Sequence, residues 1–324
     1  MAYDASVLQR AQARLDEARE QNEQDSQARI AAIYDRLPRL REIERELRKT
    51  AARVCAASFR AGEDGAQAIQ HLKEENLDLQ REREWILESN DIDPDDLEPA
   101  PICPVCSGTG WRGAVMCDCL KELCRQEQKK ELSSLLGTGR ESFDRFRLDV
   151  YPDAYDPSLG TSPREVMRSL LSKAVRYAQN FSPASGSLLF YGATGLGKTF
   201  LSGCIARTVA ERGYSVCYVS AGRLFSDFET QQFRPGASDL TRRYFDCDLL
   251  ILDDLGTEMT TQFTVSALYR VINERLMDAK PVILSSNIPP EELESRYSAQ
   301  IASRLLGAYT RFKFVGNDVR MMKK

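Results

Sequence analysis

Apolar residues follow two different patterns along this chain. From about residue 164 onward, short apolar runs alternate with longer segments in which apolar residues recur at helical spacing. The runs compact enough for buried strands are 187–191, 214–220, 248–254 and 281–287. The segments with helical spacing are 164–179, 199–212, 222–231, 239–245 and 261–278. Strands that alternate with helices predict an α/β fold, in which helices cover both faces of a parallel sheet.

The first hundred residues have helical spacing only. Two segments rich in Arg, Glu, Gln and Ala, residues 4–35 and 37–61, precede a break at residues 62–65, and Pro38 suits the first turn of a new helix. The second segment carries an apolar stripe of Leu40, Ile43, Leu47 and Val54. Beyond the break, a further stripe consists of Leu72, Leu79 and Ile86. These stripes predict an antiparallel coiled-coil hairpin, which could be a spacer or could present an apolar seam to a partner protein.

The first helical segment has apolar residues for which the sequence offers no evident internal partner. They are Val7, Leu8, Leu15, Ile30 and Ile33. An isolated helix of this polarity would be marginal in water. We therefore expect residues 1–35 to dock on a partner protein.

Cysteines cluster after the hairpin, with five of the nine between residues 103 and 124. In an intracellular chain such clustering favours a metal site over disulfides. Thiolates from Cys103, Cys106, Cys117 and Cys119 would bind one Zn²⁺ tetrahedrally, because the C-x-x-C turn brings its two sulfurs together. Cys124 could replace Cys119, since C-x-C is the less common spacing.

A glycine-rich loop lies between the first predicted strand and the helix that follows it. It fits G-x-x-x-x-G-K-[ST] with Gly192, Ala193, Thr194, Gly195, Leu196, Gly197, Lys198 and Thr199. Successive N–H groups of such a loop point at phosphate oxygens, and the helix N-terminus adds partial positive charge. Lys198 would reach the β- and γ-phosphates, and Thr199 would bind Mg²⁺. The sequence therefore predicts a nucleoside triphosphate site.

Two later strands end in polar residues that suit hydrolysis. Asp253 would hold Mg²⁺ through water, and Asp254 would polarise the attacking water. Asn287, at the end of the next strand, could orient the same water. Because Asp254 is shorter than a glutamate would be, a nucleotide-switched scaffold with little hydrolysis is also possible.

Composition excludes some classes of catalytic site and limits the partners that we expect. The single histidine, His71, excludes a Ser-His-Asp triad or a two-His zinc protease site within this chain. No apolar run approaches membrane-spanning length and the N-terminal residues are polar, so we expect a cytoplasmic protein without membrane contacts. The net charge of −4 leaves any nucleic-acid contact to a local patch.

One such patch lies between the second and third predicted strands. Its arginines are Arg223, Arg234, Arg242 and Arg243, and its aromatic residues are Phe225, Phe228, Phe233, Tyr244 and Phe245. Cationic groups for phosphates beside aromatic faces for bases are typical of a single-strand groove. The alternative is that the aromatic rings belong to the core and the arginines are solvated.

The order of motifs resembles that of bacterial replicative helicase loaders of the DnaC/DnaI type, over nearly the whole chain. The motifs are a helical hairpin, CPVCSGTGW, LLFYGATGLGKT, LLILDDLGTE and VILSSN. The resemblance implies an AAA+ core without a full lid domain, self-association through that core, and ATP-dependent loading of a replicative hexameric helicase onto single-stranded DNA. The competing interpretation is a transposition-associated AAA+ ATPase, whose core is similar.

The same resemblance assigns further residues and a domain plan. It implies that Arg304 is an arginine finger for a neighbouring subunit, that Arg320 is a second sensor within its own subunit, and that Arg223, Arg242 and Arg243 contact DNA. The plan has a partner-binding helical region at 1–100, a zinc segment at 101–130, a linker and lead-in helix at 131–185 and the ATPase core at 186–324.

Overall fold

The computed structural model describes residues 3–58, 63–135, 141–233 and 240–322. The chain divides into two compact units. One comprises residues 1–12 and 118–324, and the other comprises residues 13–117. In the described part of the chain, no helix combines the length and the apolar character that a bilayer crossing requires.

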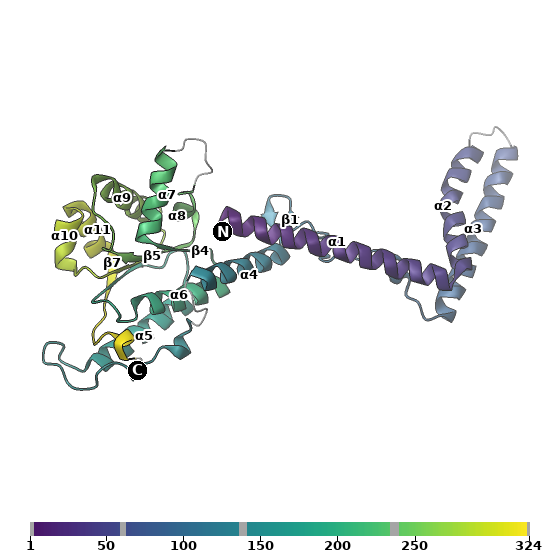
Figure 1. The fold of residues 1–324 in the computed structure, drawn as a ribbon. Helices are drawn as coiled ribbons and strands as arrows, with labels where there is room; N and C mark the ends of the chain where they lie inside the picture. The colour runs from purple at the N-terminus through teal and green to yellow at the C-terminus, as the bar shows by residue number, and fades with distance from the viewer. Residues whose placement is uncertain (1–2, 59–62, 136–140, 234–239, 323–324) are drawn as a thin grey trace. The chain divides into compact units, whose positions relative to one another are not determined.

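A five-stranded parallel sheet is the centre of the larger unit (Figure 1). Its strands in chain order are β3 (Ser187–Tyr191), β4 (Val216–Ser220), β5 (Leu249–Leu255), β6 (Val282–Ser286) and β7 (Tyr309–Lys313). Their order across the sheet is β4-β5-β6-β3-β7, and every neighbouring pair is parallel. The four strands predicted from apolar runs are present. The edge strand β7 was not predicted, because only Tyr309 and Phe312 of its five residues are buried.

Helices cover both faces of the sheet, as predicted (Figure 1). One face packs on α5 (Pro163–Gln179) and α6 (Lys198–Glu211). The opposite face packs on α7 (Ala221–Phe233), α9 (Gln262–Met277) and α11 (Ala299–Ala308). Within β3, Leu188 and Phe190 join the first core and Leu189 joins the second, because successive strand residues face opposite sides.

Short helices complete this unit. They are α8 (Arg243–Asp246), α10 (Leu293–Arg296) and the 3₁₀ turns η2 (Phe143–Arg145), η3 (Pro290–Glu292) and η4 (Val319–Met322). Of the helix expected over 239–245, only the end is seen as α8, and Asp239 lies outside the described residues.

The first turns of α1 (Ala5–Arg36) pack within the same unit, beside α4 (Asp118–Leu135). Arg10 forms ion pairs with Glu127 at 3.5 Å and Glu131 at 2.6 Å, both on α4. Tyr3, Val7 and Ala11, one helical turn apart, are buried. The expectation that Val7 lacks an internal partner is therefore wrong.

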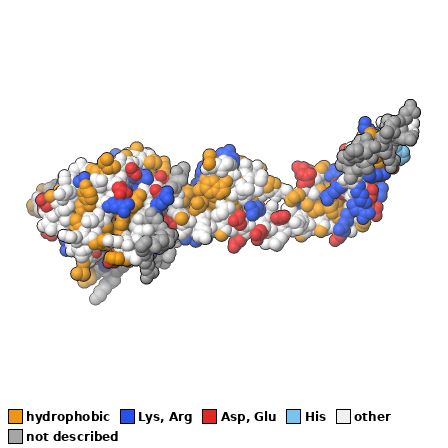
Figure 2. Space-filling model, turned by 90° about the horizontal axis from the view of Figure 1, so that it is seen from above, with side chains coloured by type: hydrophobic (Ala, Val, Ile, Leu, Met, Phe, Trp, Pro, Cys, Tyr) orange, Lys and Arg blue, Asp and Glu red, His pale blue; other side chains and the backbone are white. Residues whose placement is uncertain are grey.

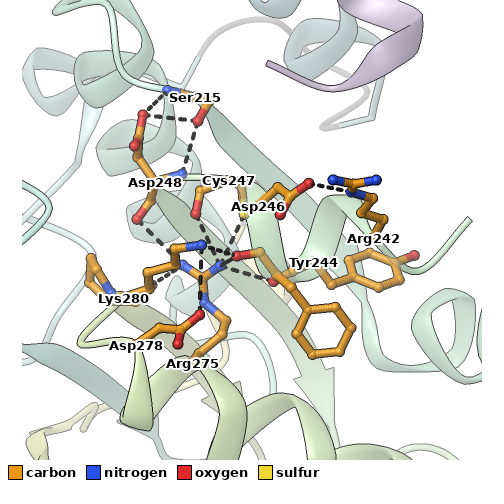
Figure 3. A network of polar contacts seen from close by, with 11 residues as sticks. Ser215, Arg242, Tyr244, Asp246, Cys247, Asp248, Arg275, Asp278 and Lys280 are labelled. Carbon is orange, nitrogen blue, oxygen red and sulfur yellow. Dashed lines mark hydrogen bonds and ion pairs between the residues drawn. The ribbon is translucent and has the colours of Figure 1, made fainter. Parts of the chain in front are cut away.

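Arg275 of α9 fixes the segments that lead into β5 and β6 (Figure 3). Its buried guanidinium donates to the carbonyl oxygens of Tyr244 at 2.9 Å, Cys247 at 3.0 Å and Pro281 at 2.8 Å. Beside it, the Asp248 carboxylate accepts hydrogen bonds from the amide and hydroxyl of Ser215, which joins the starts of β4 and β5. These contacts anchor the strands whose opposite ends carry the candidate site.

The smaller unit is helical, as predicted. Helices α2 (Pro38–Ser58) and α3 (Glu63–Ser89) pair, and their seam contains Leu40, Ile43, Leu47, Leu79 and Ile86. Arg39 forms a two-point contact with Glu82 at 2.7 and 2.8 Å, and basic and acidic side chains intermix over this hairpin (Figure 2). Ile33 of α1 packs against the seam, so the expectation that it lacks a partner is also wrong.

The rest of this unit leads to the cysteines. The 3₁₀ turn η1 (Pro94–Leu97) adds Leu97 to the seam, and Asn22 of α1 donates to the carbonyl oxygen of Ala100 at 2.7 Å. The two-residue strands β1 (Trp111–Arg112) and β2 (Val115–Met116) then form an antiparallel pair.

Candidate nucleotide-binding site and cysteine cluster

The glycine-rich loop joins β3 to α6 at the carboxyl edge of the sheet. Gly197 precedes α6 with a left-handed φ of 90°, and a Cβ there would lie 3.0 Å from the Tyr151 hydroxyl. That hydroxyl donates to the carbonyl oxygen of Leu196 at 3.0 Å, and burial raises the pKa of Tyr151. Tyr151, in the segment before α5, thus supports the loop. No sequence motif indicated this role.

Lys198 is buried at the start of α6, and only neutral groups accept its hydrogen bonds. Its Nζ donates to the carbonyl oxygens of Gly192 and Ala193, both at 2.7 Å, and to Asn287 Oδ1 at 2.8 Å. Burial lowers the pKa of Lys198. The ion pairs in the described part of the chain do not include Lys198. The loop therefore contains a desolvated cation without a bonded anion, which suits an anionic ligand.

Asp253 is buried in β5 and is held by two hydroxyl groups. Its carboxylate accepts hydrogen bonds from the Tyr218 hydroxyl at 2.7 Å and from the Ser285 hydroxyl. Burial and the Asp253 charge raise the pKa of Tyr218. Sequence reasoning missed both hydroxyl residues, although each lies in a strand that neighbours β5.

Asp254 has a left-handed φ of 56°, at an irregularity in the β5–β6 register. Such a bulge re-aims a side chain that a regular strand would direct to the other face. Burial and the charge of Asp253 raise the pKa of Asp254, while the positive charge of Lys198 opposes that rise. Lys198, Asp253, Asp254 and Asn287 thus meet at one edge, as the sequence predicted for the carboxyl ends of parallel strands.

Of the two arginines that the resemblance singled out, only Arg320 belongs to this edge. The charge of Arg320 acts on the pKa values of Lys198 and Asp254 and lowers both, against larger opposing effects on Asp254. Arg304 lies on α11, where its guanidinium donates to Asn273 Oδ1 at 3.0 Å and to the Tyr269 hydroxyl at 2.9 Å. Arg304 is therefore held against α9 and is not brought to the loop of its own chain.

A cleft of about 730 Å³ opens beside the first half of the glycine-rich loop. Residues of the loop, of the end of β7 and the segment after it, and of the segment before α5 line it, including Ala193, Leu196, Lys313, Asn317 and Pro152. Its volume falls in the range of pockets that hold drug-sized ligands.

Four cysteine sulfurs gather at the predicted knuckle. The Sγ atoms of Cys103, Cys106, Cys117 and Cys119 all lie within 4.8 Å of one another, and those of Cys103 and Cys117 are 3.9 Å apart. Sulfurs around a tetrahedral Zn²⁺ would be about 3.8 Å apart, given Zn–S bonds of about 2.3 Å. The Gly110 amide also donates to Cys106 Sγ at 3.2 Å. The donor set and its spacing fit zinc.

Cys124 does not join the cluster. It is buried on α4, and burial raises the pKa of its thiol to about 11, which keeps it protonated. Spacing alone left Cys119 and Cys124 as alternatives, and the geometry favours Cys119.

The arginines predicted to contact DNA already have acidic partners. Arg223 and Arg243 bind opposite oxygens of the buried Asp227, at 2.9 and 2.7 Å, and the Tyr244 hydroxyl donates to the same carboxylate at 2.6 Å. Arg242 pairs with Asp246 at 2.9 Å. Arg234 lies outside the described residues.

The aromatic residues of the same region mostly belong to the core. Phe225, Phe228 and Tyr244 are buried between the sheet and its helices, while Phe233 is exposed. The prediction that these rings offer faces to bases is wrong for the three buried ones. Arg223 and Arg242 keep most of their side-chain surface exposed, at 66% and 75%, whereas Arg243 keeps 29%.

A parallel sheet with this loop, a buried lysine at the helix start and paired carboxylates on a central strand defines a P-loop nucleotide-binding domain. Comparison of sequences identifies it further. Residues 168–310 match the family described as IstB-like ATP binding protein.

Curated relatives of two kinds match part of this chain. The chain is 28% identical over 127 residues to the chromosomal replication initiator protein DnaA of Campylobacter fetus, which covers 39% of this chain and 29% of the relative. It is 32% identical over 107 residues to the putative ATP-binding protein Rv3427c in an insertion sequence of Mycobacterium tuberculosis, covering 33% of this chain and 43% of the relative. The chain thus spans less than half the length of either.

Two solved structures superpose on about half of the chain. The crystal structure of the DnaC helicase loader superposes with a TM-score of 0.45 at 19% identity, over 53% of this chain and 98% of that one. The structure of DnaI superposes with a TM-score of 0.43 at 20% identity, over 47% and 86% of the two chains.

Proposed function

We propose that this protein is an ATP-dependent loader that places a replicative hexameric helicase on single-stranded DNA during replication initiation. The observation that carries the proposal is the order of the parts along the chain. An IstB-like ATP-binding domain follows a helical hairpin and a four-cysteine knuckle, in the order of the loader motifs. The hairpin and knuckle would hold the helicase, and the ATP-binding domain would control its release onto DNA in the cytoplasm.

Within the site, each side chain has a task that its contacts support. The phosphate chain of ATP would give the Lys198 ammonium the anion that it lacks. Thr199 and Asp253 offer the oxygen ligands that Mg²⁺ prefers, and when bound Mg²⁺ neutralises charge on the β- and γ-phosphates. Asp254 would accept a proton from the attacking water, and Asn287 would contact the γ-phosphate side of the loop. ATP hydrolysis is the activity that follows.

The remaining assignments concern assembly and DNA. Arg320 would contact the nucleotide of its own subunit, and Arg304 would reach that of a neighbour when AAA+ cores associate. Arg223 and Arg242, which keep exposed guanidinium surface, would contact DNA phosphates, with Arg243 holding Asp227 beneath them. Zn²⁺ bound by Cys103, Cys106, Cys117 and Cys119 would have a structural role.

A second function has its own support. The family match and the relative from an insertion sequence both favour a transposition-associated ATPase that remodels target DNA for a transposase. In that case the hairpin would hold a transposase. A scaffold that binds ATP without appreciable hydrolysis would differ from both in releasing no phosphate with or without single-stranded DNA.

Co-purification from the native host, followed by identification of the bound protein, tests the choice. The loader proposal expects a hexameric helicase, recovered with wild-type protein and with Lys198→Ala, because binding by the helical region does not need nucleotide. Transfer of that helicase to single-stranded DNA should need ATP and fail with Lys198→Ala. Recovery of a transposase in its place would establish the second function and overturn the first.

A further inference from the structure

The segment that follows β7 is bonded directly to the glycine-rich loop. The Phe314 amide donates to the carbonyl oxygen of Tyr191, where β3 ends, at 2.8 Å. Five residues later, the Val319 amide donates to the carbonyl oxygen of Gly195, within the loop, at 2.9 Å. The segment that leads to Arg320 is thus fastened to the end of β3 by one bond and to the loop by the other.

Asp318 adds a side-chain contact at the second of these points. Its carboxylate lies against Gly195 so closely that a Cβ built there would fall 1.8 Å from Asp318 Oδ1. Gly195 also has a left-handed φ of 75°, so a side chain at this position is disfavoured twice. The same Asp318 Oδ1 accepts the backbone N–H of Arg320 at 2.9 Å. One carboxylate oxygen therefore contacts the loop and orders the backbone of Arg320.

We propose that Asp318 is a positioning residue that fixes Arg320 to the glycine-rich loop, so that its guanidinium reaches the terminal phosphate of ATP. This inference rests on the proposed ATP-binding function. ADP lacks the phosphate that Arg320 would contact. The positioning of Arg320 by Asp318 therefore makes the site prefer ATP over ADP. Asp318 itself need not touch the nucleotide for this effect.

A carboxylate near an anion-binding loop could instead act through its charge alone. It would then repel ATP and ADP through the same Coulomb interaction, and any variant that removes the charge would change both affinities. The two explanations differ for Asp318→Asn. The amide keeps an oxygen that can accept the Arg320 N–H, whereas its negative charge is gone.

The test measures dissociation constants of the full-length protein for ADP and for a non-hydrolysable ATP analogue, with Mg²⁺. The variants are Asp318→Ala, Asp318→Asn, Arg320→Ala and the double variant Asp318→Ala with Arg320→Ala. Asp93→Ala is the matched control, because Asp93 accepts the Asp95 N–H at 3.0 Å in the same kind of turn, far along the chain from the loop.

We expect Asp318→Ala to lower the preference for the ATP analogue over ADP about tenfold, the effect of losing a hydrogen bond to a charged group. Asp318→Asn should stay within about twofold of wild type, since the acceptor remains. The double variant should show the same preference as Arg320→Ala, because both changes remove one contact.

Equal changes of affinity for both nucleotides in Asp318→Ala and Asp318→Asn would show that charge is responsible and overturn the positioning role. An unchanged preference in Asp318→Ala would overturn it as well. Failure of the proposed function looks different, because wild-type protein would then not bind the ATP analogue, or would bind it as tightly as Lys198→Ala does.

Discussion

The glycine-rich loop and the α7–α8 region both contain cations, and the groups that bind these cations differ. Lys198 donates to two carbonyl oxygens and one amide oxygen. Arg223 and Arg243 share the carboxylate of Asp227, and Arg242 pairs with Asp246. The first cation has neutral partners and the others have anionic ones.

This difference separates a ligand site from a scaffold. A desolvated ammonium whose hydrogen bonds all go to neutral groups is costly, and an arriving phosphate reduces that cost while it gains affinity. Arginines that are already neutralised gain less from a DNA phosphate, because a protein–protein ion pair has to loosen first. We therefore expect large nucleotide effects at the loop and modest DNA effects at α7–α8.

The largest effect should come from Lys198→Ala. Removing the only cation that the loop buries should weaken ATP binding by more than about a hundredfold, since a charge-assisted contact to the phosphates is lost. Isothermal titration with ATP and Mg²⁺ measures it. Lys173→Ala on α5, where the lysine is exposed, is the control and should bind as wild type does. Wild-type affinity in Lys198→Ala would contradict the assignment of the site.

The second effect concerns stability at α7. Asp227→Asn leaves Arg243 and the Tyr244 hydroxyl without their shared anion in a buried position, and should lower the free energy of unfolding by about 3 kcal/mol. Asp246→Asn breaks the exposed pair with Arg242 and should cost less than about 1 kcal/mol. Urea denaturation of both variants measures the difference. Equal losses would show that the Asp227 network is no more structural than a surface pair.

The contrast between these regions also shows how far the sequence could be interpreted. Apolar runs and a fixed-spacing motif located the P-loop, four strands and both carboxylates, because these features are local. Burial of Phe225 and Phe228 also had a local signal, since both fall on the apolar stripe of one helix with Leu224. Aromatic content near arginines was the weaker signal, and it misled the interpretation.

Contacts between distant segments had no such signal. Asp227 and Arg243 are sixteen residues apart on separate helices, so their pairing depends on how α7 and α8 pack. Likewise, the contact of Asp318 with Gly195 follows from β7 joining the sheet beside β3, and that edge strand has no continuous apolar run. Cys119 and Cys124 were separable only once α4 was seen to begin at Asp118.

A third, smaller effect should appear in DNA binding. If Arg223 and Arg242 contact phosphates, Arg223→Glu and Arg242→Glu should each weaken single-strand binding several-fold and reduce its salt dependence by about one counter-ion per contact. Fluorescence anisotropy at several salt concentrations, with ATP present, measures both quantities. Arg168→Glu on α5, across the sheet, is the control. Unchanged affinity in both variants would place the DNA site elsewhere.

The smallest effect should be a gain in stability at the nucleotide edge. Partial burial and the Asp253 charge raise the pKa of Asp254, so its carboxylate is slightly less favourable in the folded protein than in the unfolded chain, although the residue keeps exposed surface that screens the effect. This cost is present at neutral pH, shrinks as pH falls through the raised pKa, and vanishes below the unfolded value of about 3.8, where both states are protonated.

Asp254→Asn should therefore raise the Tm of the nucleotide-free protein at pH 7 by about 1 °C, with a difference that disappears as pH falls toward 4. Asp278→Asn, at an exposed carboxylate beyond α9, should show no such pH-dependent gain. Because Lys198 opposes the rise in the pKa of Asp254, the gain should be larger in a Lys198→Ala background. A loss of stability in Asp254→Asn at pH 7 would mean that nearby positive charge already stabilises the carboxylate in the nucleotide-free protein. Lys198 would then be less available to an anionic ligand than its hydrogen bonds indicate.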